Sequence, residues 1–242
     1  MAGEYDKSKY TRKERLLNFW YYHRLYIIIG VLAVLFVVVQ VHKLTHQPSI
    51  GFQGVFMNVI SAEQDDGTDY AAEFGKHLGV DTTKFFMDII MYEHFDISEK
   101  IDEVDYASVQ QLSAYIANGD LDVAVTDKSA FQFLGYWDCL ADLREVYTPE
   151  QLEKFDLYYV DGAIVEYRAD TMWGTEEYNI ELPDPRNPDA MEDPIPVGIY
   201  LENLSQDFDD TFSIAGGQGV AGIFVTTRRM GVCKSFIEYI TE

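Results

Sequence analysis

The pattern of apolar and polar positions divides the chain near residue 40. Leu25 to Val39 is an uninterrupted run of fifteen apolar residues. Aromatic residues precede it, so the segment extends from Phe19 to Val41 and reaches the roughly 20 residues that a membrane-spanning helix needs. No polar face interrupts the run, which disfavours the alternative of a buried core helix. We therefore expect a transmembrane helix within residues 19–44.

The charges on the two sides of this segment differ in sign. Residues 1–46 carry 7 basic and 3 acidic side chains, whereas residues 47–242 carry 11 basic and 38 acidic ones, a net charge of −27. Because Lys and Arg mark the cytoplasmic side of a span, we expect residues 1–18 to form a basic cytoplasmic tail. Residues 47–242 would then form an extracytoplasmic domain at the cell membrane.

A cleaved signal peptide is the alternative interpretation of the same segment, since it also combines a basic start with an apolar stretch. The residues that follow the run, Gln40 to Leu44, lack the small-residue pattern of a cleavage site. No cysteine lies nearby to carry a lipid anchor. These features favour an uncleaved, single-pass anchor in contact with the bilayer through residues 19–44.

Beyond the apolar run, strand-like and helix-like patterns alternate. Residues 50–60, 84–92 and 121–125 read as strands, and helical spacing over 69–78 and 105–118 separates them. This order predicts an α/β domain with crossover helices on a parallel sheet. The pair Asp161-Gly162 between two apolar runs predicts a β-hairpin. Further strands are expected at 197–201 and 222–227, and further helices at 128–136 and 228–240.

Two stretches of this domain resemble extracellular solute-binding proteins of the periplasmic-binding-protein-like type 2 superfamily. One is Gln110 to Tyr147, with its Gly119-Asp120-Leu121-Asp122 turn into a strand; the other is Gly219 to Ile240. The resemblance implies a two-lobed α/β fold with mixed sheets and a role in binding and transport. This domain is short for the family and has neither the lipid-attachment cysteine nor the long cleft-lining insertions. It is therefore expected to be a shortened, membrane-anchored form.

The resemblance implies a ligand site where a strand of the first lobe turns into the next helix. Ligands in such proteins lie between lobes, among aromatic side chains and helix N-termini. Helix capping by Thr126-Asp127-Lys128 and core packing of the aromatic residues are the alternatives. The expected ligand-binding residues are the polar Thr126, Asp127 and Ser129 and the aromatic Tyr136 and Trp137, with Phe131 as a further aromatic candidate.

Other chemistry is weakly supported. The strongly negative domain disfavours nucleic acid as a partner. It contains two histidines, His77 and His94, and no recognisable nucleophile motif, so we expect no catalytic residue, no metal and no cofactor. Gly217 to Gly222 spells GxGxxG, but a strand is expected after it where a dinucleotide site needs a helix. Cys139 and Cys233 could form a disulfide or remain as two buried thiols.

The sequence thus predicts a non-catalytic, membrane-anchored binding protein for a small-molecule ligand or for an envelope partner such as a transporter. One alternative is a protein-interaction module with no small-molecule ligand. The other is a cell-envelope hydrolase, which the missing nucleophile motif disfavours.

Overall fold

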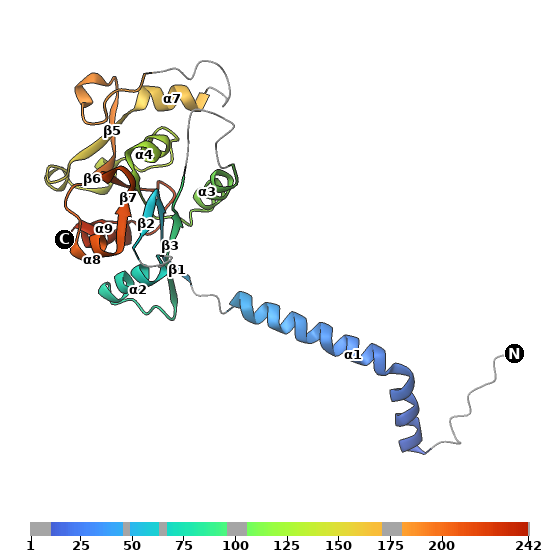
Figure 1. Cartoon of the computed structure of the whole chain (residues 1–242). Coiled ribbons are helices and arrows are strands. Elements are labelled where there is room, and N and C mark those ends of the chain that lie inside the picture. The colour runs from blue at the N-terminus through green and yellow to red at the C-terminus, as the bar shows by residue number, and fades with distance from the viewer. Residues whose placement is uncertain (1–10, 46–48, 63–66, 96–105, 171–180, 242) are drawn as a thin grey trace. The chain divides into compact units, whose positions relative to one another are not determined.

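The computed structural model describes residues 11–45, 49–62, 67–95, 106–170 and 181–241 (Figure 1). The chain divides into two compact units, Met1–Pro48 and Ser49–Glu242. The first ten residues of the expected cytoplasmic tail lie outside the described part.

The first unit contains one long helix, α1 (Arg12–Thr45). Within it, the 23 residues Phe19–Val41 are long and apolar enough to cross a membrane, and none of the span is buried by the rest of the chain. The alternative of a buried core helix is therefore not supported. A signal sequence near the N-terminus has the same length and composition, so the helix is a candidate anchor or signal.

The second unit is an α/β domain with a six-stranded mixed sheet in the order β3-β1-β4-β8-β6-β5. β1 runs parallel to both β3 and β4, as the alternation of strand and helix patterns predicts. β8 runs antiparallel to β4 and β6, and β5 antiparallel to β6. The strands are β1 (Ser49–Met57), β3 (Phe85–Tyr92), β4 (Val123–Asp127), β5 (Leu157–Asp161), β6 (Pro194–Leu201) and β8 (Gly219–Ile223).

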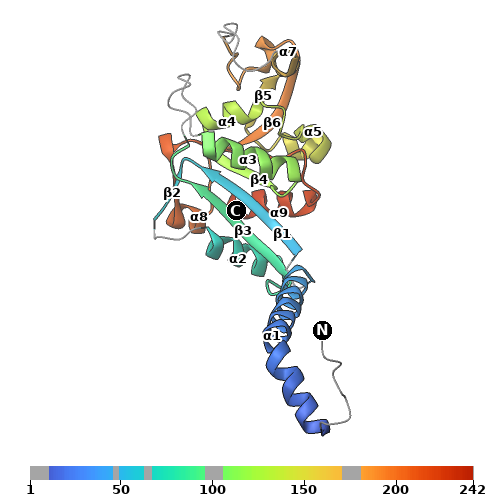
Figure 2. The ribbon, with the colours of Figure 1, turned by 90° about the vertical axis from the view of Figure 1, so that its right-hand side faces the viewer.

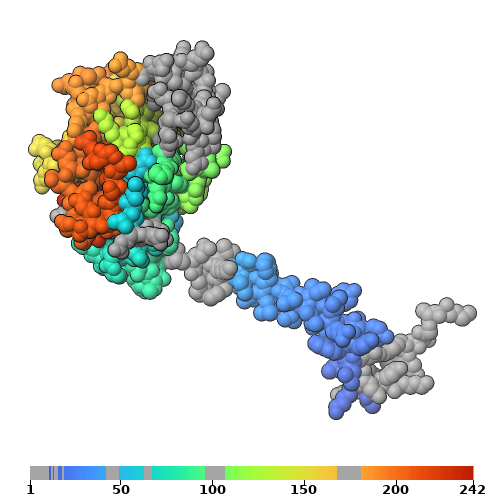
Figure 3. Space-filling view, in the orientation of Figure 1, coloured from blue at the N-terminus to red at the C-terminus, as the bar shows by residue number. Residues whose placement is uncertain are grey.

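A small second sheet pairs β2 (Val59–Ser61) antiparallel to β7 (Phe212–Ile214). Early and late segments therefore lie side by side on one face of the domain, in cyan and orange-red in Figure 3. The remaining helical elements are α2 (Thr68–His77), α3 (Tyr106–Asn118), α4 (Lys128–Gly135), α5 (Leu143–Val146), α6 (Pro149–Leu152), α7 (Gly162–Asp170), η2 (Pro188–Ala190), α8 (Gln206–Thr211), η3 (Ala215–Gly217) and α9 (Met230–Thr241).

Helices cover both faces of the main sheet (Figure 2). On one face, Phe52 and Phe56 of β1 pack with aromatic side chains of α2, α8 and α9. On the other face, Val55 and Met57 belong to a core that includes residues of α3 and α4. β1 is therefore buried on both sides, which explains why its sequence reads as a nearly continuous apolar run.

The resemblance to solute-binding proteins implies two lobes, but the described residues of the second unit share one principal sheet. The reason lies in β8, which comes late in the chain yet pairs with β4 on one side and β6 on the other. Strand β8 thus joins β4 to β6 within the six-stranded sheet. β8 also starts and ends earlier than the strand expected at 222–227.

The hairpin prediction at Asp161-Gly162 is wrong, because helix α7 begins at Gly162 directly after β5. The carboxylate of Asp161 accepts the N–H of Ala163 at 3.1 Å, and also those of Glu192 at 2.9 Å and Asp193 at 3.1 Å. Burial raises the pKa of Asp161, but these three N–H groups lower it by more, so the pKa lies below its usual range. The ionised side chain therefore stabilises a strand-to-helix turn.

Two glycines on neighbouring strands make room for one aromatic ring. A Cβ at Gly198 of β6 would lie 2.6 Å from Phe131 Cε1, and one at Gly222 of β8 would lie 2.8 Å from Phe131 Cε2. Overpacking of this kind typically costs ~1–3 kcal/mol, so we expect Gly198→Ala to lower the urea midpoint of the full chain in detergent. Gly231→Ala is the control, because no atom lies within 4 Å of a Cβ there. An unchanged midpoint for Gly198→Ala would contradict this account.

Candidate functional site

The carboxyl ends of β1, β3 and β4 meet at one edge of the sheet, since the three strands are parallel. We call this the carboxyl edge and define it by Asn58, Phe95 and Asp127, which lie at or just after the ends of these strands. Open α/β sheets commonly bind ligands beyond the carboxyl ends of their strands. This edge is therefore the candidate site.

Asn58 connects the three strand ends. Its side-chain Nδ2 donates to Asp127 Oδ1 at 2.7 Å and to the Phe95 carbonyl at 3.1 Å, and its Oδ1 accepts the Phe95 N–H at 2.7 Å. Its backbone carbonyl accepts the N–H of Ala215, the first residue of η3. Asn58 has a positive φ of 56°, which asparagine tolerates better than most residues, and it separates β1 from β2.

Sequence reasoning missed Asn58 because it lies inside the apolar stretch 50–60, which was interpreted as a single strand. The available signal is a lone asparagine, a residue that adopts left-handed conformations, between two apolar runs.

Asp127 caps helix α4. Its Oδ2 accepts the backbone N–H of Ser129 at 3.1 Å and also the Ser129 hydroxyl, while its Oδ1 accepts from Asn58. Burial raises the pKa of Asp127, but these hydrogen bonds and one from the Ala130 N–H hold it below its usual range. Both oxygens of the ionised carboxylate are therefore engaged within the fold, as a helix cap requires.

The other predicted polar residues lie beside this cap. Thr126 is buried, and its hydroxyl lies 3.3 Å from Asp127 Oδ1. Ser129 is exposed on the first turn of α4. The structure thus brings Thr126, Asp127 and Ser129 together, with Ser129 as the one that faces solvent.

Tyr136 and Trp137 lie at the opposite end of α4. An eight-residue helix is about 12 Å long, so about that length of backbone separates these aromatic residues from Asp127. Tyr136 is buried in the core, and its hydroxyl lies 3.4 Å from the N–H of Asp161 at the other edge of the sheet. Trp137 packs on Phe133 with ring centroids 4.8 Å apart. Tyr136 and the fully buried Phe131 therefore belong to the core, and the half-buried Trp137 packs against it.

The GxGxxG segment, Gly217 to Gly222, and the preceding Gly216 also lie at the carboxyl edge, next to Asn58. Gly216 and Gly217 both have positive φ, 75° and 72°, and no atom lies within 4 Å of a Cβ at either position. Strand β8 follows and pairs Gly219 with Asp127. The segment is thus a glycine turn into a strand, without the helix that would face a pyrophosphate. It lies beside Asn58 and presents bare backbone to solvent.

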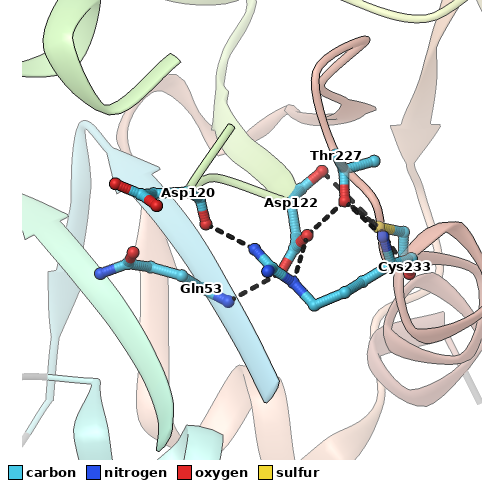
Figure 4. A network of polar contacts seen from close by, with 6 residues as sticks. Gln53, Asp120, Asp122, Thr227 and Cys233 are labelled. Atoms are coloured by element: carbon cyan, nitrogen blue, oxygen red, sulfur yellow. Dashed lines mark hydrogen bonds and ion pairs between the residues drawn. The ribbon is translucent and has the colours of Figure 1, made fainter. Parts of the chain in front are cut away.

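A second polar cluster lies at the amino end of β4, at the other edge of the sheet (Figure 4). Asp122 is 0% exposed, and its carboxylate accepts Arg229 Nε at 2.8 Å and 3.0 Å and the Gln53 N–H at 2.9 Å. The hydroxyl of Thr227 also donates to it, and Arg229 Nη2 reaches the Asp120 carbonyl at 2.7 Å. The cluster ties β1 and β4 to the start of α9.

Burial raises the pKa of Asp122, while its hydrogen bonds from Arg229, Thr227 and Gln53 oppose that rise. The hydrogen-bond donors to the Asp122 carboxylate thus come from the backbone of Gln53 and the side chains of Thr227 and Arg229. Because the side chain has no contact with solvent, we assign this cluster a structural role. Its only sequence signal is an acidic residue inside the apolar strand 121–125.

Both cysteines are free and buried, so the disulfide alternative is excluded. Burial raises the pKa of each thiol to about 12. We therefore expect the folded chain to react very slowly with a thiol reagent at neutral pH, and two thiols to titrate once it is denatured without reductant. Fewer than two thiols in the denatured chain would contradict the structure.

Among the described residues, no group of three or more His, Cys, Asp or Glu side chains is placed to hold a metal ion. The arrangement defines an α/β domain with a mixed sheet, preceded by one apolar helix. Comparison with protein-family models, curated proteins and solved structures finds no match.

Proposed function

We propose that this chain is a membrane-anchored, extracytoplasmic binding protein without catalytic activity. The observation that carries the proposal is the pairing of a 23-residue apolar helix, exposed along its length, with a separate and strongly acidic α/β unit. Helix α1 would hold the domain at the membrane, with the basic N-terminal residues in the cytoplasm. The α/β unit would be a solute-binding-protein-like domain reduced to one principal sheet.

The carboxyl edge is the proposed binding surface. Both carboxylate oxygens of Asp127 are used within the fold and Thr126 is buried, which leaves few groups at this edge to recognise a small solute. Among the described residues, the solvent-facing groups at this edge include Ser129, the glycine turn at Gly216 and Gly217, and the exposed Glu93 and His94. These features favour an envelope protein over a small molecule as the occupant.

The topology is tested by treating intact cells with protease. We expect the acidic domain to be degraded while α1 and the N-terminal tail remain protected. The N-terminal mass of the protein purified from membranes separates an anchor from a cleaved signal. Full protection of the domain, or a mature chain that starts after residue 45, would overturn the proposed anchoring.

The occupant is tested with a photo-crosslinking amino acid at Ser129 and, as a matched control, at the exposed Glu192, which lies beside Asp161 at the other edge of the sheet. We expect a discrete crosslinked protein from Ser129 alone. In parallel, a thermal-shift screen of the full chain in detergent against sugars, amino acids, peptides and metal ions should give no shift. A reproducible shift with one solute, together with no crosslink, would favour the solute-binding alternative.

A further inference from the structure

Two adjacent phenylalanines at the start of β3 are exposed to solvent. Phe85 is 42% and Phe86 40% exposed, and Lys84 before them is exposed as well. Because successive side chains of a strand point to opposite faces, the two rings leave both faces of the strand end apolar. We call Lys84, Phe85 and Phe86 the aromatic tip.

The exposure of Phe85 has a local cause. Gly51 of β1 lies beside this strand end, and a Cβ there would lie 2.9 Å from Phe85 Cβ. With no side chain at Gly51, this residue of β1 does not cover the ring. Large apolar side chains of the domain are otherwise mostly in the core, so this pair is unusual among the described residues.

The aromatic tip is tied directly to the point where the chain enters the domain. The N–H of Ser49 donates to the Lys84 carbonyl at 3.1 Å, and Ser49 pairs with Phe85 in the register of β1 and β3. Helix α1 ends at Thr45. Four residues span at most about 14 Å, so Ser49, the residue that pairs with the tip, is within that distance of Thr45 along the chain.

The charge around the tip also differs from that of the rest of the domain. Residues 73–87 are neutral, because Lys76 is ion-paired with Glu73 and Lys84 with Asp81, whereas residues 47–242 have a net charge of −27. Aromatic rings favour the headgroup level of a bilayer. Lys84 Nζ lies 3.1 Å from Asp81 Oδ2 in an exposed pair, and such pairs are weak enough for the ammonium group to turn toward lipid phosphates. Two copies of so acidic a domain repel each other, which disfavours a second copy as the occupant of this surface.

We propose that the aromatic tip inserts into the headgroup region of the bilayer in which α1 is anchored. The inference rests on the proposed membrane anchoring and adds a second lipid contact, made by the folded domain. β1 has nine residues at about 3.3 Å each, so it would hold the carboxyl edge roughly 30 Å from the tip and toward the exterior.

The test places a fluorescent probe on an engineered cysteine in the full chain, reconstituted into phosphatidylcholine vesicles that contain headgroup-labelled nitroxide lipid. Thr83→Cys reports on the tip and leaves both phenylalanines in place. Ile60→Cys is the matched control, because Ile60 is similarly exposed, at 46%, but lies beyond the other end of β1. Wild type, labelled in parallel, measures any reaction of the two buried native cysteines.

We expect nitroxide lipid to quench the probe at 83 several-fold more strongly than the probe at 60. Adding Phe85→Ser and Phe86→Ser to the Thr83→Cys chain should reduce quenching to the level at 60, with the circular dichroism spectrum unchanged. Equal quenching at 83 and 60, or no effect of the two serines, would overturn the proposal. If the fluorescence of the probe at 83 depends on protein concentration in lipid-free detergent, the tip contacts a second copy of the chain. That result would also overturn the proposal.

Flotation of the same samples separates this inference from the one on which it depends. A chain that does not float with the vesicles refutes the membrane anchor. A chain that floats while the probe at 83 is unquenched refutes the aromatic tip alone.

Discussion

Replacing Arg229 with methionine is expected to lower the free energy of unfolding by ~3–5 kcal/mol at neutral pH, because it leaves a fully buried carboxylate without its charge partner. Asp122 is 0% exposed and would retain only the donors from Gln53 and Thr227. Urea unfolding of the full chain in detergent measures the loss. Arg228→Met is the matched control: Arg228 is adjacent and exposed, so its replacement should change stability by less than ~0.5 kcal/mol.

The same variant should have a characteristic pH dependence. Burial raises the pKa of Asp122 in the folded state above the unfolded value of about 3.9, and loss of Arg229 raises it further. The folded state then binds a proton that the unfolded state releases, so stability increases as pH falls from neutrality through the folded pKa. Replacing both partners with apolar residues, Asp122→Leu with Arg229→Met, should recover part of the loss. If Arg229→Met destabilises the chain no more than Arg228→Met does, the ion pair between Asp122 and Arg229 contributes little to stability.

The second large effect is expected at Asn58. Removing its side chain breaks one hydrogen bond to a carboxylate and two to the backbone of Phe95, which together should cost about 2–3 kcal/mol. Asn58→Gly adds no strain from the positive φ, since glycine adopts it freely, whereas Asn58→Ala should cost ~1 kcal/mol more. Asp138 has a similar φ of 54° but is exposed, so Asp138→Ala isolates the backbone cost.

Asn58→Asp tests the electrostatic part of this site. It places a second carboxylate where an amide now donates to Asp127 at 2.7 Å. Two carboxylates so close raise one another's pKa in the folded state, so the variant should be destabilised at neutral pH and recover as pH falls. If Asn58→Asp unfolds at the same urea concentration as wild type at neutral pH, the carboxyl edge does not have the geometry described.

Local sequence patterns predicted the parts of this protein that local interactions decide. The apolar run became α1, the three early strands became parallel neighbours, and Asn118-Gly119 ended α3 with a positive φ at Gly119. The cap at Asp127 was also readable, because its partner Ser129 is two residues away.

The features that were missed depend on distant partners. Asp161-Gly162 has the composition of a hairpin turn, but N–H groups of Glu192 and Asp193 hold Asp161 in a strand-to-helix turn. Asp122 and Arg229 are 107 positions apart, so no local sequence pattern predicts their ion pair. The grouping of Tyr136 and Trp137 with Asp127 depended on the cleft that the resemblance implies, and it stays a prediction; the structure places helix α4 between them.

The position of β8 has a consequence for how the domain reaches its folded state. Val220 pairs with Thr126 and also with Tyr200, so β4 and β6 have no bridge between them until the segment Gly219–Ile223 arrives. Pairings between such distant positions carry a large loop-closure cost and form slowly. If the domain crosses the membrane in chain order from residue 49 onward, β4 pairs with β1 on one side and leaves an unpaired apolar edge on the other, of the kind that aggregates. The six-stranded sheet is therefore expected to form only after residue 223 has crossed. Until then the unpaired edge of β4 must be protected from aggregation.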